Sequence, residues 1–315
     1  MHSLFSKVDV YFNNQIVGSS GNNYAYKAYL ESLLSFEKNY INSQGQCPLF
    51  CIDTDGNKLT IDNEDHEYRK SLLAKSAQLE FIDKLRVDIF NQPKYLINDV
   101  DVNVSLIRSI NEFVVKYKPD PLKTDISPVI KLMVASLFVR KQVLYPSLIH
   151  SHQKLLENGQ RARYATKKTE VKFFTVPQGN TSFIEENVFL GMIPNRMVMG
   201  FVESSSFNGS YAENPFRFNH FGACYLSVCV NEIPTTIKPL NSDFEKKMYL
   251  QAYYMLFTSL GLNSKNHGLL IDRESFKNGS TLFAYDLTAM DKADSNLWIS
   301  KKVVQLKLSV IFKKL

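Results

Sequence analysis

Two histidines and a glutamate near the middle of the chain come closest to a metal-binding pattern. The order His150-Ser151-His152, Glu157 and Pro177-Gln178-Gly179 loosely imitates a cupin site, where alternate histidines on one strand point the same way. Here the neighbouring apolar residues have helical spacing, and helical residues two apart point about 200° away from each other. Ser182 occupies the position where a further histidine would follow. We therefore expect exposed histidines on a short helix and assign no metal site.

The four cysteines raise the question of zinc binding or disulfide formation. Cys47 and Cys51 have His66 as the one nearby imidazole, and a single cysteine pair does not complete a tetrahedral zinc site. Cys224 and Cys229 fall on opposite faces of a strand, so they cannot bind one ion together. So few cysteines fit a reduced, intracellular setting. We expect small core or surface thiols.

The sequence contains no Gly-rich phosphate loop, no nucleophile elbow and no zincin helix. We assign no catalytic, cofactor-binding or metal residue, and we predict that the chain is not an enzyme. The aromatic stretch Phe207–His220 could form a ligand cradle or pack against a neighbouring subunit. The C-terminal stretch is basic, which is typical of a strand edge protected by lysines, with contact to nucleic acid as the alternative. Its lysines are Lys301, Lys302, Lys307, Lys313 and Lys314.

Length and composition describe an ordinary globular protein. The chain has 315 residues, 44% hydrophobic and 22% charged, and its 37 basic and 31 acidic residues leave a net charge of +6. These values exclude disorder and favour two domains or one large β unit. The first residues do not form a signal peptide. The longest apolar stretch, Val129–Val139, is too short to cross a membrane. We expect neither secretion nor membrane insertion.

The elements that would position these residues follow from periodicity. Alternation predicts strands, and i, i+3, i+4 spacing predicts helices. The predicted strands cover 8–12, 85–89, 100–106, 135–144, 171–176, 196–202, 224–230 and 305–315, and the predicted helices cover 26–34, 148–156 and 249–260. The prolines in Lys118-Pro119-Asp120-Pro121 interrupt any element. We therefore expect domains at 1–118 and 128–315, joined by a linker at 119–127.

The two halves share a pattern. The strand ending at Phe12 runs into the polar turn Asn13-Asn14, and the strand ending at Val230 runs into Asn231-Glu232, 218 positions later. Each is followed by an isoleucine, a polar loop and a tyrosine-rich helix. The alternative is a chance match between two amphipathic pieces. Two β halves that each contain one inserted helix predict tandem jelly rolls.

Several segments spread along the chain match one known family in the same order. They are His2–Asn13, Tyr24–Glu31, Tyr95–Val102, Ser136–Lys141, Phe207–Tyr211, Asn214-Pro215-Phe216, Phe218 with His220, and Leu282–Thr288. Together they resemble the major capsid protein (hexon) of Polinton/Maverick elements and adintoviruses, and the similarity covers nearly the whole chain.

The resemblance implies an all-β tandem double jelly roll with short inserted helices. It also implies trimeric, pseudo-hexameric capsomers of an icosahedral shell, inside a eukaryotic host. The partners would be further copies, neighbouring capsomers, a penton-type minor capsid protein and, through the basic C-terminal stretch, packaged DNA. Compared with the family pattern, the first jelly roll lacks its N-terminal strands and the second its last strand. Two alternatives stay open: a domesticated or defective jelly-roll binding module and, less favoured, a cupin-like metal enzyme.

Overall fold

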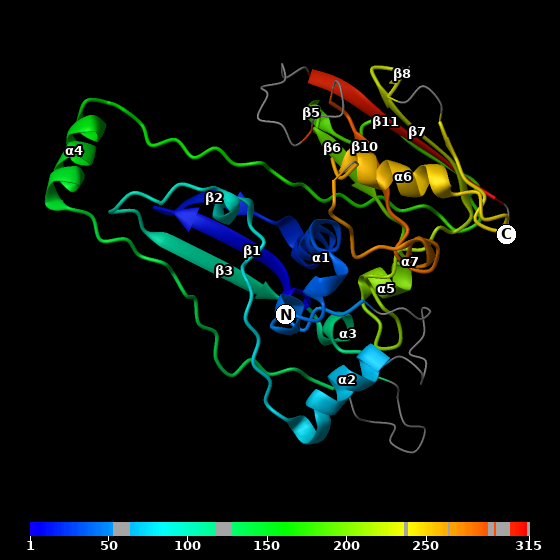
Figure 1. The fold of residues 1–315 in the computed structure, drawn as a ribbon, viewed down its shortest axis with the longest axis horizontal. Helices are drawn as coiled ribbons and strands as arrows, with labels where there is room; N and C mark the ends of the chain where they lie inside the picture. Colours follow the sequence, from blue (N-terminus) through cyan, green and yellow to red (C-terminus); the bar gives the residue numbers. More distant parts are fainter. Residues whose placement is uncertain are drawn as a thin grey trace. The chain divides into compact units, whose positions relative to one another are not determined.

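The computed structural model describes residues 1–52, 64–117, 128–235, 239–263, 265–288, 293 and 303–313 (Figure 1). Contacts divide the chain into two compact units, each made of separate stretches of sequence. Unit 1 comprises Met1, Tyr29–Asp83 and Lys172–Leu315, and unit 2 comprises His2–Ala28 and Lys84–Val171. The predicted linker 119–127 lies outside the described residues. The division of the chain into 1–118 and 128–315 therefore stays a prediction.

Unit 2 is built on an antiparallel sheet in the order β2-β1-β3. Its strands are β1 (Phe5–Phe12), β2 (Gln15–Ser19) and β3 (Val102–Arg108). Asn13 and Asn14 join β1 to β2 with φ values of 47° and 63°. Positive φ at both central residues defines the hairpin turn whose twist matches that of the strands. The strand and turn predicted here are confirmed, as is the strand predicted at 100–106.

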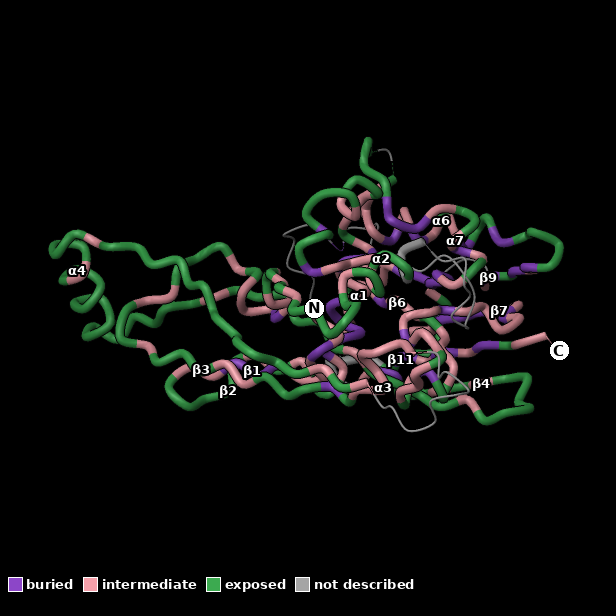
Figure 2. The backbone as a smooth tube through the Cα atoms, turned by 90° about the horizontal axis from the view of Figure 1, so that it is seen from below, coloured by how far each residue is buried: buried purple, intermediate pink, exposed green. Residues whose placement is uncertain are grey.

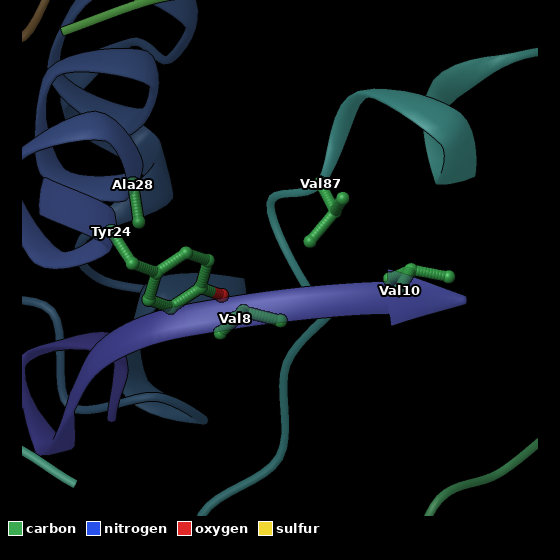
Figure 3. Close-up of a cluster of buried hydrophobic side chains, with 5 residues drawn as sticks. All are labelled: Val8, Val10, Tyr24, Ala28 and Val87. Atoms are coloured by element: carbon green, nitrogen blue, oxygen red, sulfur yellow. The ribbon is translucent and has the colours of Figure 1, made fainter. Parts of the chain in front are cut away.

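One face of β1 makes the core of unit 2. Val8 and Val10 point to the same side of the strand and pack against Tyr24 and Ala28 from α1 (Tyr24–Ser35) and against Val87 (Figure 3). All five side chains are at most 2% exposed. Alternation along β1 explains this face, because every second side chain of a strand points to the same side.

The stretch around Val87 differs from the expected strand at 85–89. Val87 is extended, with φ −111° and ψ 135°, and a short 3-10 helix begins at the next residue. Alternate apolar residues still reach the core, which is why the pattern resembled a strand. Within the described part of the chain no strand pairs with this segment, so the prediction of a strand is wrong here.

Unit 2 continues into a long, mostly exposed stretch. It contains α3 (Asn111–Val114) and α4 (Pro146–Glu157), and Figure 2 shows the chain on both sides of α4 as exposed. The predicted helix at 148–156 is confirmed, and Gly159 follows it with a φ of 80°. The strand predicted at 135–144 does not form in the described structure. A strand needs a neighbouring backbone, and none of the described residues pairs with this segment.

In its described residues, unit 1 contains a six-stranded sheet and a two-stranded sheet. One has the order β4-β11-β7-β8, with β5 also pairing with β11 and β9 with β7, and a second sheet pairs β10 with β6. The strands are β4 (Ser182–Glu185), β5 (Leu190–Met192), β6 (Arg196–Met199), β7 (Ala223–Val230), β8 (Ile233–Pro234), β9 (Leu240–Asn241), β10 (Phe283–Asp286) and β11 (Val303–Phe312). The strands predicted at 196–202, 224–230 and 305–315 are thus confirmed with shifted ends. The strand predicted at 171–176 is absent from the described structure.

Short helices cover parts of unit 1. They are α2 (Glu64–Leu72), α5 (Ser204–Asn208), α6 (Leu250–Ser259) and α7 (Arg273–Lys277). The predicted helix at 249–260 is confirmed as α6. The buried Ser259 hydroxyl donates to the Ala284 carbonyl at 2.9 Å, which joins α6 to β10. The 3-10 turns among the described residues of both units are His2–Leu4, Gly21–Asn23, Lys38–Tyr40, Gln44–Gln46, Ala74–Ser76 and Asp88–Asn91.

The described residues form several antiparallel sheets with short helices between the strands, which agrees with the predicted all-β class at this level. Within those residues, no helix is both long and apolar enough to cross a membrane.

Candidate functional site

The two polar turns predicted as a repeat have the same hydrogen bonds. The Asn13 N–H donates to the Asp101 carbonyl at 3.0 Å, and the Asn13 Oδ1 accepts from the Asp101 N–H at 2.8 Å. The Asn231 N–H donates to the Gln305 carbonyl at 2.9 Å, and the Asn231 Oδ1 accepts from the Gln305 N–H at 3.0 Å. Each asparagine therefore joins a hairpin turn to the strand that follows much later in the sequence.

The strands beyond these turns also match in register. β1 pairs with β3, and β7 pairs with β11. In each pair the register is continuous until one residue of the first strand has no partner. This bulged residue is Ser6 in β1 and Cys224 in β7. The skipped side chains occupy equivalent places, because Ser6 Oγ lies 3.3 Å from the Ile107 carbonyl and Cys224 Sγ 3.4 Å from the Ile311 carbonyl. Two strand units that share a turn, a register and a bulge favour a duplication over a chance match.

The pattern of buried residues is the same in β1 and β7 but differs between β3 and β11. β1 and β7 have the same buried positions in their centres. In β11, Leu306 and Val310 are both 0% exposed, whereas the equivalent residues of β3, Val102 and Leu106, are 47% and 40% exposed. Unit 2 therefore leaves apolar residues of β3 exposed at positions where unit 1 buries the equivalent residues of β11.

Comparison with known proteins finds similarity to a protein whose function is not characterized. The chain is similar to an uncharacterized protein of Caenorhabditis elegans, with 25% identity over an alignment that covers 99% of this chain and 73% of the relative. No known family model matches the sequence. No solved structure matches it.

The histidines that imitate a cupin site lie on a helix, as the sequence predicted. His150 and His152 are exposed residues of α4, and Ser182 begins β4 in the other unit. Histidines two apart on a helix point in different directions and do not share an ion. Within the described residues, no group of three histidine, cysteine or acidic side chains is placed to hold a metal.

None of the four cysteines, all within the described residues, forms a disulfide. Cys47 is exposed, and the other three are partly buried. The His66 side chain lies outside the described part of the chain. Cys224 occupies the bulge of β7, and Cys229 lies further along the same strand, with its Sγ 3.7 Å from Ser227 Oγ. These contacts describe small side chains within a sheet.

The aromatic stretch Phe207–His220 fills space inside unit 1. Phe216 stacks on Tyr29 with ring centroids 4.5 Å apart, and Phe207 lies against Phe173 at 4.5 Å. Phe218 is 4% exposed. Rings that are occupied in this way do not form an open cradle for a ligand. The alternation of aromatic and polar residues could not show this, because the rings that meet them come from distant segments.

His220 begins an aromatic stack that the sequence did not indicate. Its ring lies 4.2 Å from that of Phe244, with the planes 4° apart, and Phe244 in turn lies 5.2 Å from Tyr249. The His220 Nδ1 accepts a hydrogen bond from the Gly222 N–H at 3.0 Å. Burial, helped by the nearby positive charge of Lys277, lowers the pKa of His220. A neutral ring that accepts a backbone hydrogen bond in an aromatic stack has a structural role.

Two lysines of the basic C-terminal stretch have acidic partners. Lys307 Nζ lies 3.2 Å from Glu186 Oε1, and Lys313 Nζ lies 2.7 Å from Asp243 Oδ2. The hydrogen bond to Asp243 raises the pKa of Lys313. Lys301, Lys302 and Lys314 lie outside the described residues. Contact with DNA through this stretch stays a prediction, and two of its charges already face carboxylates.

The stretch before α4 is the most exposed apolar segment of unit 2. Eight of its large apolar side chains are between 42% and 93% exposed. They are Val129, Leu132, Met133, Val134, Leu137, Phe138, Val139 and Val143. Contiguous exposed apolar surface of this kind marks an interaction site in soluble proteins. The candidate functional features of this chain are therefore surfaces and strand edges.

Proposed function

We propose that this chain is a structural subunit of a viral or transposon-encoded capsid, with the fold of a double jelly roll. The observation that carries the proposal is the duplicated strand unit, in which the same turn, bulge and asparagine hydrogen bonds occur twice in one chain. The collinear resemblance to the Polinton/Maverick and adintovirus hexon points to the same fold.

The path of the chain through unit 1 supports a jelly roll. Successive strands change sheets: β4 belongs to the larger sheet, β6 to the smaller, β7 and β8 to the larger, β10 to the smaller, and β11 to the larger between β4 and β7. Crossing connections between two sheets are the mark of Greek-key and jelly-roll folds. The Phe201 ring lies 6.1 Å from Phe283 in β10 and 5.3 Å from Phe312 in β11, so side chains link the sheets.

A capsid subunit acts through its surfaces. Three copies would form a pseudo-hexameric capsomer, and capsomers would tile an icosahedral shell with a penton-type protein at its vertices. Obligate interfaces of this type bury on the order of 2,000–5,000 Å² and are apolar. The exposed apolar stretch before α4 is surface of the required kind. No catalytic step is part of this function.

The test is assembly. The chain should be expressed by itself and within the reading frame extended through its flanking DNA, then measured by light scattering and negative-stain electron microscopy. We expect trimers with hexagonal outlines and, at high concentration, curved sheets or shells. A matched variant, Val134→Lys with Phe138→Lys, places charges on the exposed stretch and should reduce association without unfolding the chain.

Two results would contradict the proposal. A protein that stays monomeric in both forms at high concentration would favour the binding module. A stoichiometric metal ion in the purified protein would favour the cupin-like enzyme instead.

A further inference from the structure

The outer edge of β3 in unit 2 corresponds to an edge of β11 in unit 1 that has a strand neighbour. There, β4 pairs antiparallel with β11 along Leu308–Ile311. The shared register makes Val104–Ile107 the equivalent residues of β3. Among the described residues, β3 pairs with β1 alone. The duplication thus shows which kind of neighbour this edge can accept, an antiparallel strand.

The backbone groups of this edge can be assigned from the ladder. In an antiparallel pair, the N–H and C=O groups of successive residues point alternately toward and away from the partner. The backbone groups of Asp101 and Ser109 face the β1 side. Asp101 exchanges hydrogen bonds with Asn13, and the Ser109 N–H donates to the Leu4 carbonyl. The backbone N–H and C=O groups of the even-numbered residues therefore point outward, away from β1. These residues are Val102, Val104, Leu106 and Arg108. Unit 1 shows the same direction, because the N–H of Phe312, the equivalent of Arg108, donates away from β7 to the Thr181 carbonyl at 2.8 Å.

The segment 134–141 has the properties of a strand that lacks neighbours. It reads Val-Ala-Ser-Leu-Phe-Val-Arg-Lys, and all of its residues are exposed. Apolar residues on both faces are typical of a strand covered on both sides. Within the described structure, its backbone makes no hydrogen bond to β3. Within the described residues, neither the outer edge of β3 nor this segment has a strand neighbour.

Charge selects the direction of pairing. Arg140 and Lys141 end the segment, while the exposed Asp99 and Asp101 precede β3. An antiparallel arrangement places the basic end of the segment beside the acidic start of β3, which is the direction that β4 takes along β11. Parallel pairing would place the basic end beside Arg108. Opposite charges across neighbouring strands stabilise pairing, and like charges oppose it.

We propose that the outer edge of β3 binds residues 134–141 of a second copy of this chain as an added antiparallel strand. The backbone bonds of the outward-facing groups supply affinity, and alternate side chains supply selectivity, as in other cases of strand addition. The proposal rests on the duplicated register and the charges, and does not depend on the capsid function.

The test uses the full chain and a fluorescent peptide of residues 134–141. We expect saturable binding by anisotropy, with affinity reduced at least tenfold by Leu106→Pro, which removes an outward N–H and leaves the ladder to β1 intact. Ile16→Pro is the matched control, because Ile16 lies on β2 at the opposite edge of the same sheet and is 56% exposed. It should bind the peptide like the unchanged chain. Circular dichroism should show both variants folded.

A charge exchange tests the direction of pairing and also serves if Leu106→Pro fails to fold. The peptide with Arg140→Glu and Lys141→Glu should bind the unchanged chain at least tenfold more weakly, and should regain affinity for the chain with Asp99→Lys and Asp101→Lys. Absence of peptide binding, equal loss in both proline variants, or no recovery on charge exchange would each overturn the proposal. These results are independent of whether trimers or shells form.

Discussion

Asn13 and Asn231, 218 positions apart, make the same two hydrogen bonds to a distant strand, one from the backbone N–H and one to the side-chain Oδ1. Both residues have positive φ, 47° and 49°. Asparagine suits this position twice over, since it tolerates the left-handed region and its short amide reaches a neighbouring backbone group. The pair therefore marks equivalent points of two halves of the chain.

Replacement of Asn231 by alanine should destabilise unit 1. The change removes the acceptor for the Gln305 N–H and places a Cβ-bearing residue without compensation in the left-handed region. We expect a loss of about 1–2 kcal/mol in the free energy of unfolding, measured by urea denaturation. Asn231→Gly keeps the backbone conformation but not the side-chain bond, so it should lose less. Equal stability of Asn231→Ala and the unchanged protein would contradict a role for this bond.

Glu232 is the second residue of the same turn, with a φ of 66°. A left-handed conformation costs a non-glycine residue roughly 1 kcal/mol, and glycine avoids this cost. Glu232→Gly should therefore raise the thermal midpoint of unfolding, while Glu232→Ala should leave it nearly unchanged. Differential scanning calorimetry measures both. A decrease with glycine would show that the Glu232 side chain makes a stabilising contact.

The Tyr285 hydroxyl is buried in β10 and has no hydrogen-bond partner among the described residues. Burial raises the pKa of this tyrosine. Because an unpaired buried hydroxyl costs about 1–3 kcal/mol, Tyr285→Phe should be neutral or stabilising. Ser259→Ala is the matched comparison, since its buried hydroxyl does have a partner, and it should cost about 1 kcal/mol. Urea denaturation of both variants would test this, and a clear loss for Tyr285→Phe would contradict it.

Asp272 is the N-cap of α7, where its carboxylate accepts hydrogen bonds from the Ser275 N–H at 2.8 Å and the Lys38 ammonium at 2.7 Å. The hydrogen bond from Lys38, followed by that from Ser275, lowers the pKa of Asp272 to about 2. A carboxyl group with a lowered folded-state pKa stabilises the fold above its unfolded pKa, near 4, and loses this contribution as the pH falls toward 2.

Asp272→Asn keeps the helix cap and removes the titration. The difference in unfolding midpoint between the unchanged protein and this variant should therefore shrink between pH 5 and pH 2. Asp272→Ala should cost about 1 kcal/mol at neutral pH through loss of the cap. The Lys38 contribution is small because both side chains are largely exposed, so Lys38→Met should change stability little. A pH-independent difference for Asp272→Asn would contradict the assignment.

The local sequence pattern determined where many of the strands and helices lie in the chain. Alternation located β1, β3, β7, β6 and β11, helical spacing located α1, α4 and α6, and the asparagine turns indicated the repeat. These features depend on residues close in sequence, whose side chains need only choose a face of a helix or strand. The helical position of the two histidines of α4 followed from the same reasoning.

Tertiary structure decided which extended segments have strand partners. The stretches 85–89, 135–144 and 171–176 have strand-like patterns, yet none pairs in the described structure, because a ladder requires the backbone of a distant segment that local pattern does not specify. The ring contacts of Phe216 and His220 likewise depend on partners remote in sequence. The bulge at Ser6 and Cys224 and the side-chain bonds of Asn13 and Asn231 exist only because β3 and β11 return to those positions.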